Sequence, residues 1–256
     1  MTMLPVPLSD DMTPEIAALA ARYRRANGPV MTLVNRLGGT LEKQLAMVPV
    51  AYRGQVERVV ERALAASYTV AGQGARLPDM SARLGDKGPM MAAMATGAVG
   101  GAGGLPSALA ELPVTITVIL HAIQQAAREA GFDPEDPAIK AECIAVFGAG
   151  SPLSADDGIN TSFLSARLTL TGPAVQKVIA SVAPKLAAAL GQKLAAQAVP
   201  VLGAVTGAAL NAAFLSYYRE VARVRFALLR LAGVHGVEPV LLAFRKASEP
   251  GRIRKA

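Results

Sequence analysis

The sequence predicts an all-α protein, a compact multi-helix bundle with two central glycine-rich apolar helical segments packed together. Three observations lead to this fold class. Helix start and stop signals, such as a proline after a capping residue and a glycine after an apolar run, recur along the chain. Residues 49–70 place valine and leucine on one helical face and charged residues mostly on the other. Two long apolar stretches, residues 88–120 and 194–218, contain glycines four positions apart, which suits close packing of helices.

The first predicted helix starts at Thr13, where Thr-Pro-Glu supplies a cap, a first-turn proline and a first-turn acid. The Asn-Gly pair at residues 27–28 is expected to end it, and a short helix is predicted over residues 29–37. The amphipathic helix over residues 49–70 follows. The glycine-rich, polar stretch 71–88 is predicted to be a loop or hinge.

The first apolar stretch is expected to divide into two helices. Residues 89–99 suit a helix, and the glycines and proline of residues 100–106 are expected to break it. The second helix is predicted to start or kink at Pro113 and to reach Ala130, with Gly131 as its C-terminal stop. Its segment VTITVIL resembles a buried strand in isolation, but the helical pattern that follows without a break favours a helix.

The remainder of the chain carries further helix signals. Two successive cap-plus-proline signals, in the string DPEDP, predict a helix that runs through Val146. Four later helices are predicted: residues 159–170, an alanine-rich run from Pro173, residues 201–231, and a short segment from Val237.

Glycines at intervals of four shape one face of each apolar segment. They remove side chains from that face and let two helix backbones approach closely. We therefore predict that the two segments contact each other through a set of helix-packing glycines: Gly97, Gly101, Gly104, Gly203 and Gly207.

Composition and charge narrow the class of partner. Hydrophobic residues make up 52% of the 256 residues and charged residues 18%, and the net charge is +7. Basic residues concentrate before the first apolar stretch and after the second, so an anionic phospholipid membrane surface is the predicted partner, with a membrane protein as a further candidate. Nucleic acid is not predicted, because the chain has no Trp and only 4% aromatic residues to stack on bases.

The single cysteine, Cys143, and an N-terminus without a basic region followed by an apolar one predict a cytoplasmic protein. Together with the charge pattern, this predicts association with the inner face of the cell membrane.

Glu111 is the only ionisable residue of the stretch 88–120. Acids in apolar surroundings often handle protons, ions or headgroups, so Glu111 is a functional candidate. In the structural alternative, Glu111 caps backbone amides near Pro113 or pairs with an arginine such as Arg219.

Three more residues are ligand-binding or functional candidates beside Glu111. Asn211 shares a helix face with Gly203 and Gly207, so its amide is placed to bind Glu111 across the helix pair or to bind a ligand. His121 lies ten residues beyond Glu111, about 15 Å along a helix, and Arg219 is the suggested cationic partner.

No metal site, cofactor or catalytic residue is predicted. His121, His235 and Cys143 form no known zinc-binding pattern, and residues 100–104 contain G-x-G without a full nucleotide-binding motif.

Two blocks of the sequence resemble the EcsC family of bacterial proteins. The first contains Gly103-Gly104, Glu111-Leu112-Pro113 and Val146-Phe147, and the second contains Pro200, Gly203-Ala204, Gly207, Asn211 and Phe214. The similarity covers residues 33–236, which leaves a helical extension over 1–32 and a short helix with a basic tail over 237–256. The resemblance implies a bacterial, membrane-linked role, since the family is named for a gene beside an ABC transporter operon, but it implies no catalytic residues.

Three functional hypotheses follow. The first is a membrane-associated accessory protein that binds lipid or another apolar or anionic ligand at the cytoplasmic membrane face. The second is an interaction subunit of an ABC transporter or secretion system. The third is an enzyme that uses Glu111 as general acid or base.

Overall fold

The computed structural model describes residues 12–36, 50–72, 87–149, 174–196 and 202–248, and it confirms the all-α bundle. These residues are almost entirely helical and contain no strand. The helices are α1 (Met12–Arg36), α3 (Val50–Gly72), α5 (Lys87–Ala102), α6 (Gly104–Glu129), α7 (Pro137–Ala145), the 3₁₀ turn η1 (Val146–Ala149), α9 (Ala174–Ala196), α10 (Leu202–His235) and α11 (Val237–Ser248).

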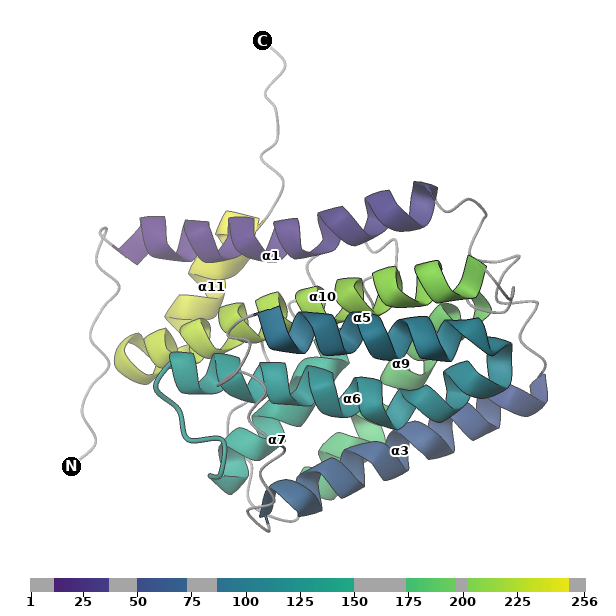
Figure 1. The fold of residues 1–256 in the computed structure, drawn as a ribbon. Coiled ribbons are helices and arrows are strands. Elements are labelled where there is room, and N and C mark those ends of the chain that lie inside the picture. The colour runs from purple at the N-terminus through teal and green to yellow at the C-terminus, as the bar shows by residue number, and fades with distance from the viewer. Residues whose placement is uncertain (1–11, 37–49, 73–86, 150–173, 197–201, 249–256) are drawn as a thin grey trace.

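Helix α10 is the centre of the bundle. It packs against α5, α6, α1 and α11, while α3 lies against α9 and α6 (Figure 1). The predicted contact between the two glycine-rich apolar segments is confirmed, because α5 lies along the N-terminal half of α10.

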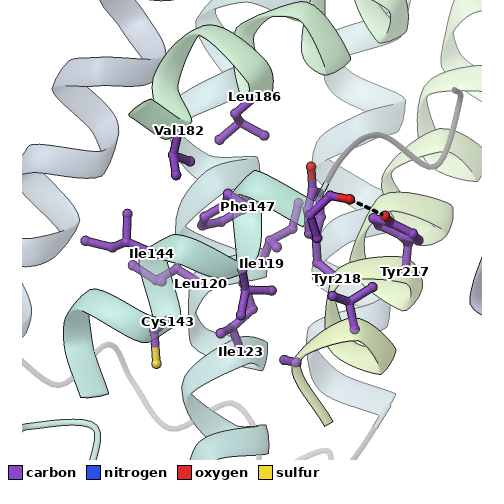
Figure 2. Close-up of a cluster of buried hydrophobic side chains, with 14 of the residues drawn as sticks. Ile119, Leu120, Ile123, Cys143, Ile144, Phe147, Val182, Leu186, Tyr217 and Tyr218 are labelled. Carbon is purple, nitrogen blue, oxygen red and sulfur yellow. Dashed lines mark hydrogen bonds between the residues drawn. The ribbon is translucent and has the colours of Figure 1, made fainter. Parts of the chain in front are cut away.

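Apolar side chains from α6, α7, α9 and α10 meet around η1 (Figure 2). The rings of Phe147 and Tyr218 are 5.1 Å apart, and both side chains are fully buried. The hydroxyl of Tyr217 donates a hydrogen bond of 3.3 Å to the carbonyl of Ala149. This bond and the packed rings fix the turn after α7 against α10.

The predicted helix end at residues 27–28 is wrong, because α1 runs without interruption from Met12 to Arg36. The predicted short helix over residues 29–37 is therefore the second half of α1. Gly28 and Pro29 disfavour a helix by roughly 1 and 3 kcal/mol relative to alanine, but tertiary contacts often override such local preferences. Here α1 packs along α10 and α11.

The predicted break over residues 100–106 is much tighter than expected. Helix α5 continues to Ala102, and α6 begins at Gly104, whose φ of +69° forms the turn. Pro106 does not stop α6, because it lies in the first turn, where a missing N–H breaks no helical hydrogen bond.

Pro113 does not start a helix, contrary to one of the two predicted roles, because it lies inside α6. The hydroxyl of Thr117 donates a hydrogen bond of 2.8 Å to the Pro113 carbonyl. The segment VTITVIL is helical, which excludes the strand alternative.

Other local predictions are confirmed. Gly131 ends α6 with a φ of +87°, and the side chain of Asp136 accepts a hydrogen bond of 2.7 Å from the amide of Ala138 at the start of α7. The long helix predicted over residues 201–231 is α10, which extends to His235. The helix predicted over residues 159–170 and most of the loop predicted over 71–88 lie outside the described residues.

Candidate functional site

Helices α6, α9 and α10 bring Glu111, Lys193 and Asn211 together in the interior. Lys193 Nζ lies 3.0 Å from Glu111 Oε2 and 3.1 Å from Oε1, so the ammonium bridges both carboxylate oxygens. Asn211 Nδ2 donates to Glu111 Oε1 at 2.6 Å, which confirms the contact predicted across the helix pair. The hydroxyl of Thr115, one turn along α6, also donates to this carboxylate. We call these four residues and Thr96 the polar junction.

The amide of Asn211 also connects the junction to α5. Its Nδ2 lies within hydrogen-bond distance of Ala93 O (2.9 Å), Thr96 Oγ1 (3.2 Å) and Thr115 Oγ1 (3.3 Å), besides Glu111. An amide nitrogen has two protons, so the Glu111 carboxylate and the Ala93 carbonyl, at the two shortest distances, are its best acceptors. The opposite amide orientation would point Oδ1 at the carboxylate and is electrostatically unfavourable.

Two glycines of α5 make room for this arrangement. A Cβ atom added at Gly97 would overlap with the backbone carbonyl of Gly207 and lie 2.9 Å from Cγ of Asn211. A Cβ atom added at Gly100 would lie 3.0 Å from both Cβ and Cδ of Glu111. The predicted helix-packing role therefore holds for Gly97 and Gly207, and Gly100 serves the same purpose against the carboxylate.

The other glycines predicted to pack helices have different positions. Gly101 is buried in α5. Nothing lies within 4 Å of a Cβ atom added at Gly104, whose positive φ shows that it serves the turn between α5 and α6 instead of helix packing. Gly203 lies in the first turn of α10.

The polar junction is almost completely removed from solvent. Lys193 is 0% exposed, Asn211 0% and Glu111 8%. Burial lowers the pKa of Lys193 below its usual value, and the neighbouring Glu111 carboxylate opposes this effect. Taking both charges out of water is costly, so a buried pair of this kind is weak evidence for net stabilisation.

Three members of the junction, Lys193, Thr115 and Thr96, were not predicted from the sequence, and Lys193 is the one that carries charge. The structure replaces the suggested partner Arg219 with Lys193. A signal was present, because the buried positions of α9 recur at helical spacing: Ile179, Val182, Leu186, Leu190 and then Lys193. A lysine on the apolar face of a helix is expected to pair with a buried acid, and Glu111 is the only ionisable residue of the apolar stretch 88–120.

His121 and Arg219 lie outside the junction. His121 is half-buried on α6, ten residues or about 15 Å beyond Glu111 along the helix axis. Arg219 is half-buried on α10, two turns beyond Asn211, and its Nε has no hydrogen-bond partner among the described residues.

A second buried ion pair joins α7 to α10. Arg225 Nη2 and Nε lie 2.7 and 3.0 Å from Glu142 Oε2, and both side chains are nearly inaccessible. Burial, followed by the nearby Glu142 charge, raises the pKa of the adjacent Cys143 thiol to about 12, so this cysteine stays protonated and acts as a small core residue.

Within the described ranges, no group of three His, Cys, Asp or Glu side chains is arranged to hold a metal ion. The described cavity is lined by residues other than Glu111, whose carboxylate is engaged by Lys193, Asn211 and Thr115. The contacts of the junction connect α5, α6, α9 and α10.

The fold and its junction define a helical-bundle protein with a charged network sealed between glycine-rich helices. The model of the EcsC protein family matches residues 79–231, and the chain belongs to this family. The match contains α5, α6, α7, α9 and most of α10, and therefore every member of the polar junction. No curated protein and no solved structure gives a significant match to the chain.

Proposed function

We propose that the protein is a membrane-associated accessory protein that binds an anionic phospholipid surface through the outer face of α5. The observation that carries this proposal is the exposure of large apolar side chains on that face. Met91, Met94 and Val99 are 57%, 44% and 71% exposed. We call these three residues the α5 outer face.

A surface helix of a globular protein normally presents polar residues to water. Helix α5 does not, because no ionisable residue occurs between Lys87 at its start and Glu111 in α6. One side of α5 packs on α10 through Ala93 and Gly97, and the opposite side is apolar as well. An apolar patch of this kind is typical of a surface covered by a membrane or a partner.

Neighbouring helices extend the apolar surface. Helix α5 runs antiparallel to α10, since Ala93 lies at Asn211 and Gly97 at Gly207. The same register sets Val99 level with Val205, which is 73% exposed. On α6, beside α5 in Figure 1, Val114 is 47% exposed.

The apolar character of α6 supports contact with a membrane surface more than passage through it. Among the described helices, α6 alone is long and apolar enough to cross a membrane by length and composition. Half of its most apolar 18-residue window is buried in the bundle, as in the core helix of a folded domain. The net charge of +7 favours anionic lipid headgroups over neutral ones.

Flotation with lipid vesicles tests the proposal. The full chain is expected to float with vesicles that contain phosphatidylglycerol and to float less with phosphatidylcholine alone. The double substitution Met91→Asp/Val99→Asp places two acids on the α5 outer face and is expected to abolish flotation. A matched control, Val234→Asp/Leu242→Asp, changes two residues of similar exposure (53% and 56%) near the C-terminal end of α10 and on α11, and should float normally.

Circular dichroism of each variant separates lost binding from lost folding, and the milder pair Met91→Gln/Val99→Thr repeats the test without added charge. Equal flotation of the α5 variants and the wild type would show that another surface binds the lipid. If the wild type stays with the soluble fraction on all vesicles, the membrane proposal is wrong.

In that case the α5 outer face would support the second hypothesis, an interaction subunit of a membrane transporter or secretion system, because the same patch suits a protein partner. The contacts of Glu111 do not favour the third hypothesis, an enzyme, because its carboxylate is paired and does not line the cavity found among the described residues.

A further inference from the structure

A cavity of about 400 Å³ lies where α1, α6 and α10 meet, at the other end of the bundle from the polar junction. The cavity is lined in part by three small side chains, which leave space between the helices: Ala126 and Ala130 on α6 and Ala227 on α10. Charged side chains form the remainder of the lining: Arg22, Glu129, Arg223 and Arg230. We call this cavity the arginine pocket.

The pocket exists because α5 is shorter than α10. The antiparallel register of Ala93 with Asn211 and Gly97 with Gly207 sets Lys87, the first residue of α5, level with about residue 217 of α10. The stretch of α10 from Arg223 to Arg230 therefore extends beyond α5. Figure 1 shows α5 beginning partway along α10, with α1 and the end of α6 on either side of the part that α5 does not reach.

Each arginine of the pocket has an acidic neighbour, but the three are not held equally. Arg223 bridges Glu129 and Glu220, with distances of 3.0 Å to each, and these contacts raise its pKa, so it remains a cation. Arg22 pairs with Glu220, and Arg230 lies 3.4 Å from Glu15.

The side chains of Arg22 and Arg230 are 44% and 58% exposed. Ion pairs at such positions contribute only ~0–1 kcal/mol, so another anion can replace the acidic partner at little cost. A phosphate group offers several oxygens in the geometry that suits the guanidinium fork, and its charge-assisted hydrogen bonds are stronger than those of a neutral ligand. The lining contains three arginines and the carboxylate of Glu129, and Glu220 and Glu15 pair with the arginines from outside the lining, so a phosphate would replace the partners of Arg22 and Arg230.

We infer that the arginine pocket binds a phosphate group, with Arg22 and Arg230 as its direct ligands and Arg223 as the fixed cation behind them. The phosphate belongs either to a soluble phosphate ester or to a phospholipid headgroup, since both present the same group to the pocket. This inference goes beyond membrane binding and does not depend on it, because a soluble ester tests the site without any vesicle.

The first arm of the test is titration calorimetry of the full chain with glycerol 3-phosphate at low salt. Arg22→Gln/Arg230→Gln is expected to weaken binding at least tenfold and leaves Arg223 and its two ion pairs in place. Ala227→Leu should weaken binding as well by filling the cavity without changing charge. The matched controls are Arg128→Gln/Arg245→Gln, which removes two exposed arginines elsewhere, and Ala180→Leu on the exposed side of α9.

The second arm repeats the comparison by flotation with phosphatidylglycerol vesicles. If glycerol 3-phosphate binds and only the pocket variants lose it, the pocket takes a soluble phosphate ester. If only vesicle binding is weakened by the pocket variants and not by the controls, the ligand is a headgroup phosphate. The inference is overturned if the wild type binds neither probe, or if pocket variants and controls behave alike in both arms.

Discussion

The Glu111–Lys193 and Glu142–Arg225 pairs are both buried, but they are built differently. In the first, the carboxylate is shared among Lys193, Asn211 and a threonine, and Gly100 leaves the space beside it. In the second, Nε and Nη2 of Arg225 converge on one oxygen of Glu142. The first pair joins α6 to α9, and Asn211 adds α10 and reaches α5 through the Ala93 carbonyl, whereas the second pair joins α7 to α10.

This difference predicts how each pair responds when its members are replaced. A pair that joins two helices can be replaced in principle by apolar side chains of similar volume. A network that is shared by four helices depends on every member, because removing one leaves buried donors or acceptors without partners. We therefore expect the position of α5, and of its apolar outer face, to depend on the polar junction as well as on its packing against α10.

The largest effect is expected from breaking either pair on one side only. Lys193→Met and Arg225→Met each leave a buried carboxylate without its cation, which costs about 3–5 kcal/mol of unfolding free energy. Urea denaturation measures this loss. A loss below about 1 kcal/mol for Lys193→Met would mean that Glu111 does not need its cation.

Replacing both partners of a pair with apolar residues should affect stability differently at the two pairs. Glu142→Met/Arg225→Met is expected to recover part of the stability lost by Arg225→Met, because it removes the buried carboxylate that the single substitution leaves without its cation. Glu111→Met/Lys193→Met should remain destabilised by about 1–3 kcal/mol, because Thr115 and Asn211 lose their acceptor. Equal recovery in the two double variants would show that the wider network adds nothing to the first pair.

The glycine contact between α5 and α10 gives a third, steric test. Gly97→Ala places a methyl group against the Gly207 carbonyl, which is backbone and cannot rotate away, so a loss of about 1–3 kcal/mol is expected. Gly191→Ala on α9 is the matched control, since nothing lies within 4 Å of the added carbon. Removing a helical glycine there should stabilise the protein by roughly 0.5–1 kcal/mol. A stabilised Gly97→Ala variant would refute the close approach of the two helices.

The smallest effect concerns the surface pairs beside the arginine pocket. Burial raises the pKa of Glu220, but Arg22 and Arg223 lower it more, so the folded-state pKa lies below the ordinary value of 4.5. The stabilisation is therefore complete above that value and is lost as the pH falls through the folded-state pKa. Urea midpoints measured from pH 7 to pH 3 should fall slightly less steeply in Glu220→Gln, since exposed pairs contribute about 0–1 kcal/mol. If the urea midpoint of Glu220→Gln falls with pH as steeply as that of the wild type, Glu220 does not contribute to the loss of stability in acid.

Much of the fold could be predicted from local signals. Asp136 with its following proline and Gly131 with its positive φ act within a few residues, so the sequence contains all the information needed to place them. The Gly28–Pro29 sequence in α1 could not be interpreted in this way, because long-range packing on α10 and α11 decides the outcome there.

Only part of the candidate site could be predicted, because some of its residues carry a local signal and others depend on contacts between distant segments. Glu111 and Asn211 stand out as polar residues in apolar stretches, and glycines four apart place Asn211 toward the neighbouring segment. Lys193 does not stand out by composition, since α9 carries two other lysines, Lys177 and Lys185, and only the spacing of apolar residues along α9 shows that it faces inward. The arginine pocket depends on where α5 begins relative to α10, which is a matter of register between distant segments.

Hydrogen–deuterium exchange of an Asn211→Leu variant tests most directly whether the polar junction holds α5 in place. This substitution removes the amide group that connects Glu111 to the Ala93 carbonyl and replaces it with an apolar side chain of similar size. The amides of α5 are expected to lose protection, while those of α7 and the C-terminal half of α10, which the Glu142–Arg225 pair holds, keep theirs. Unchanged protection of α5, or an equal loss across all helices, would contradict a specific role of the junction in positioning α5.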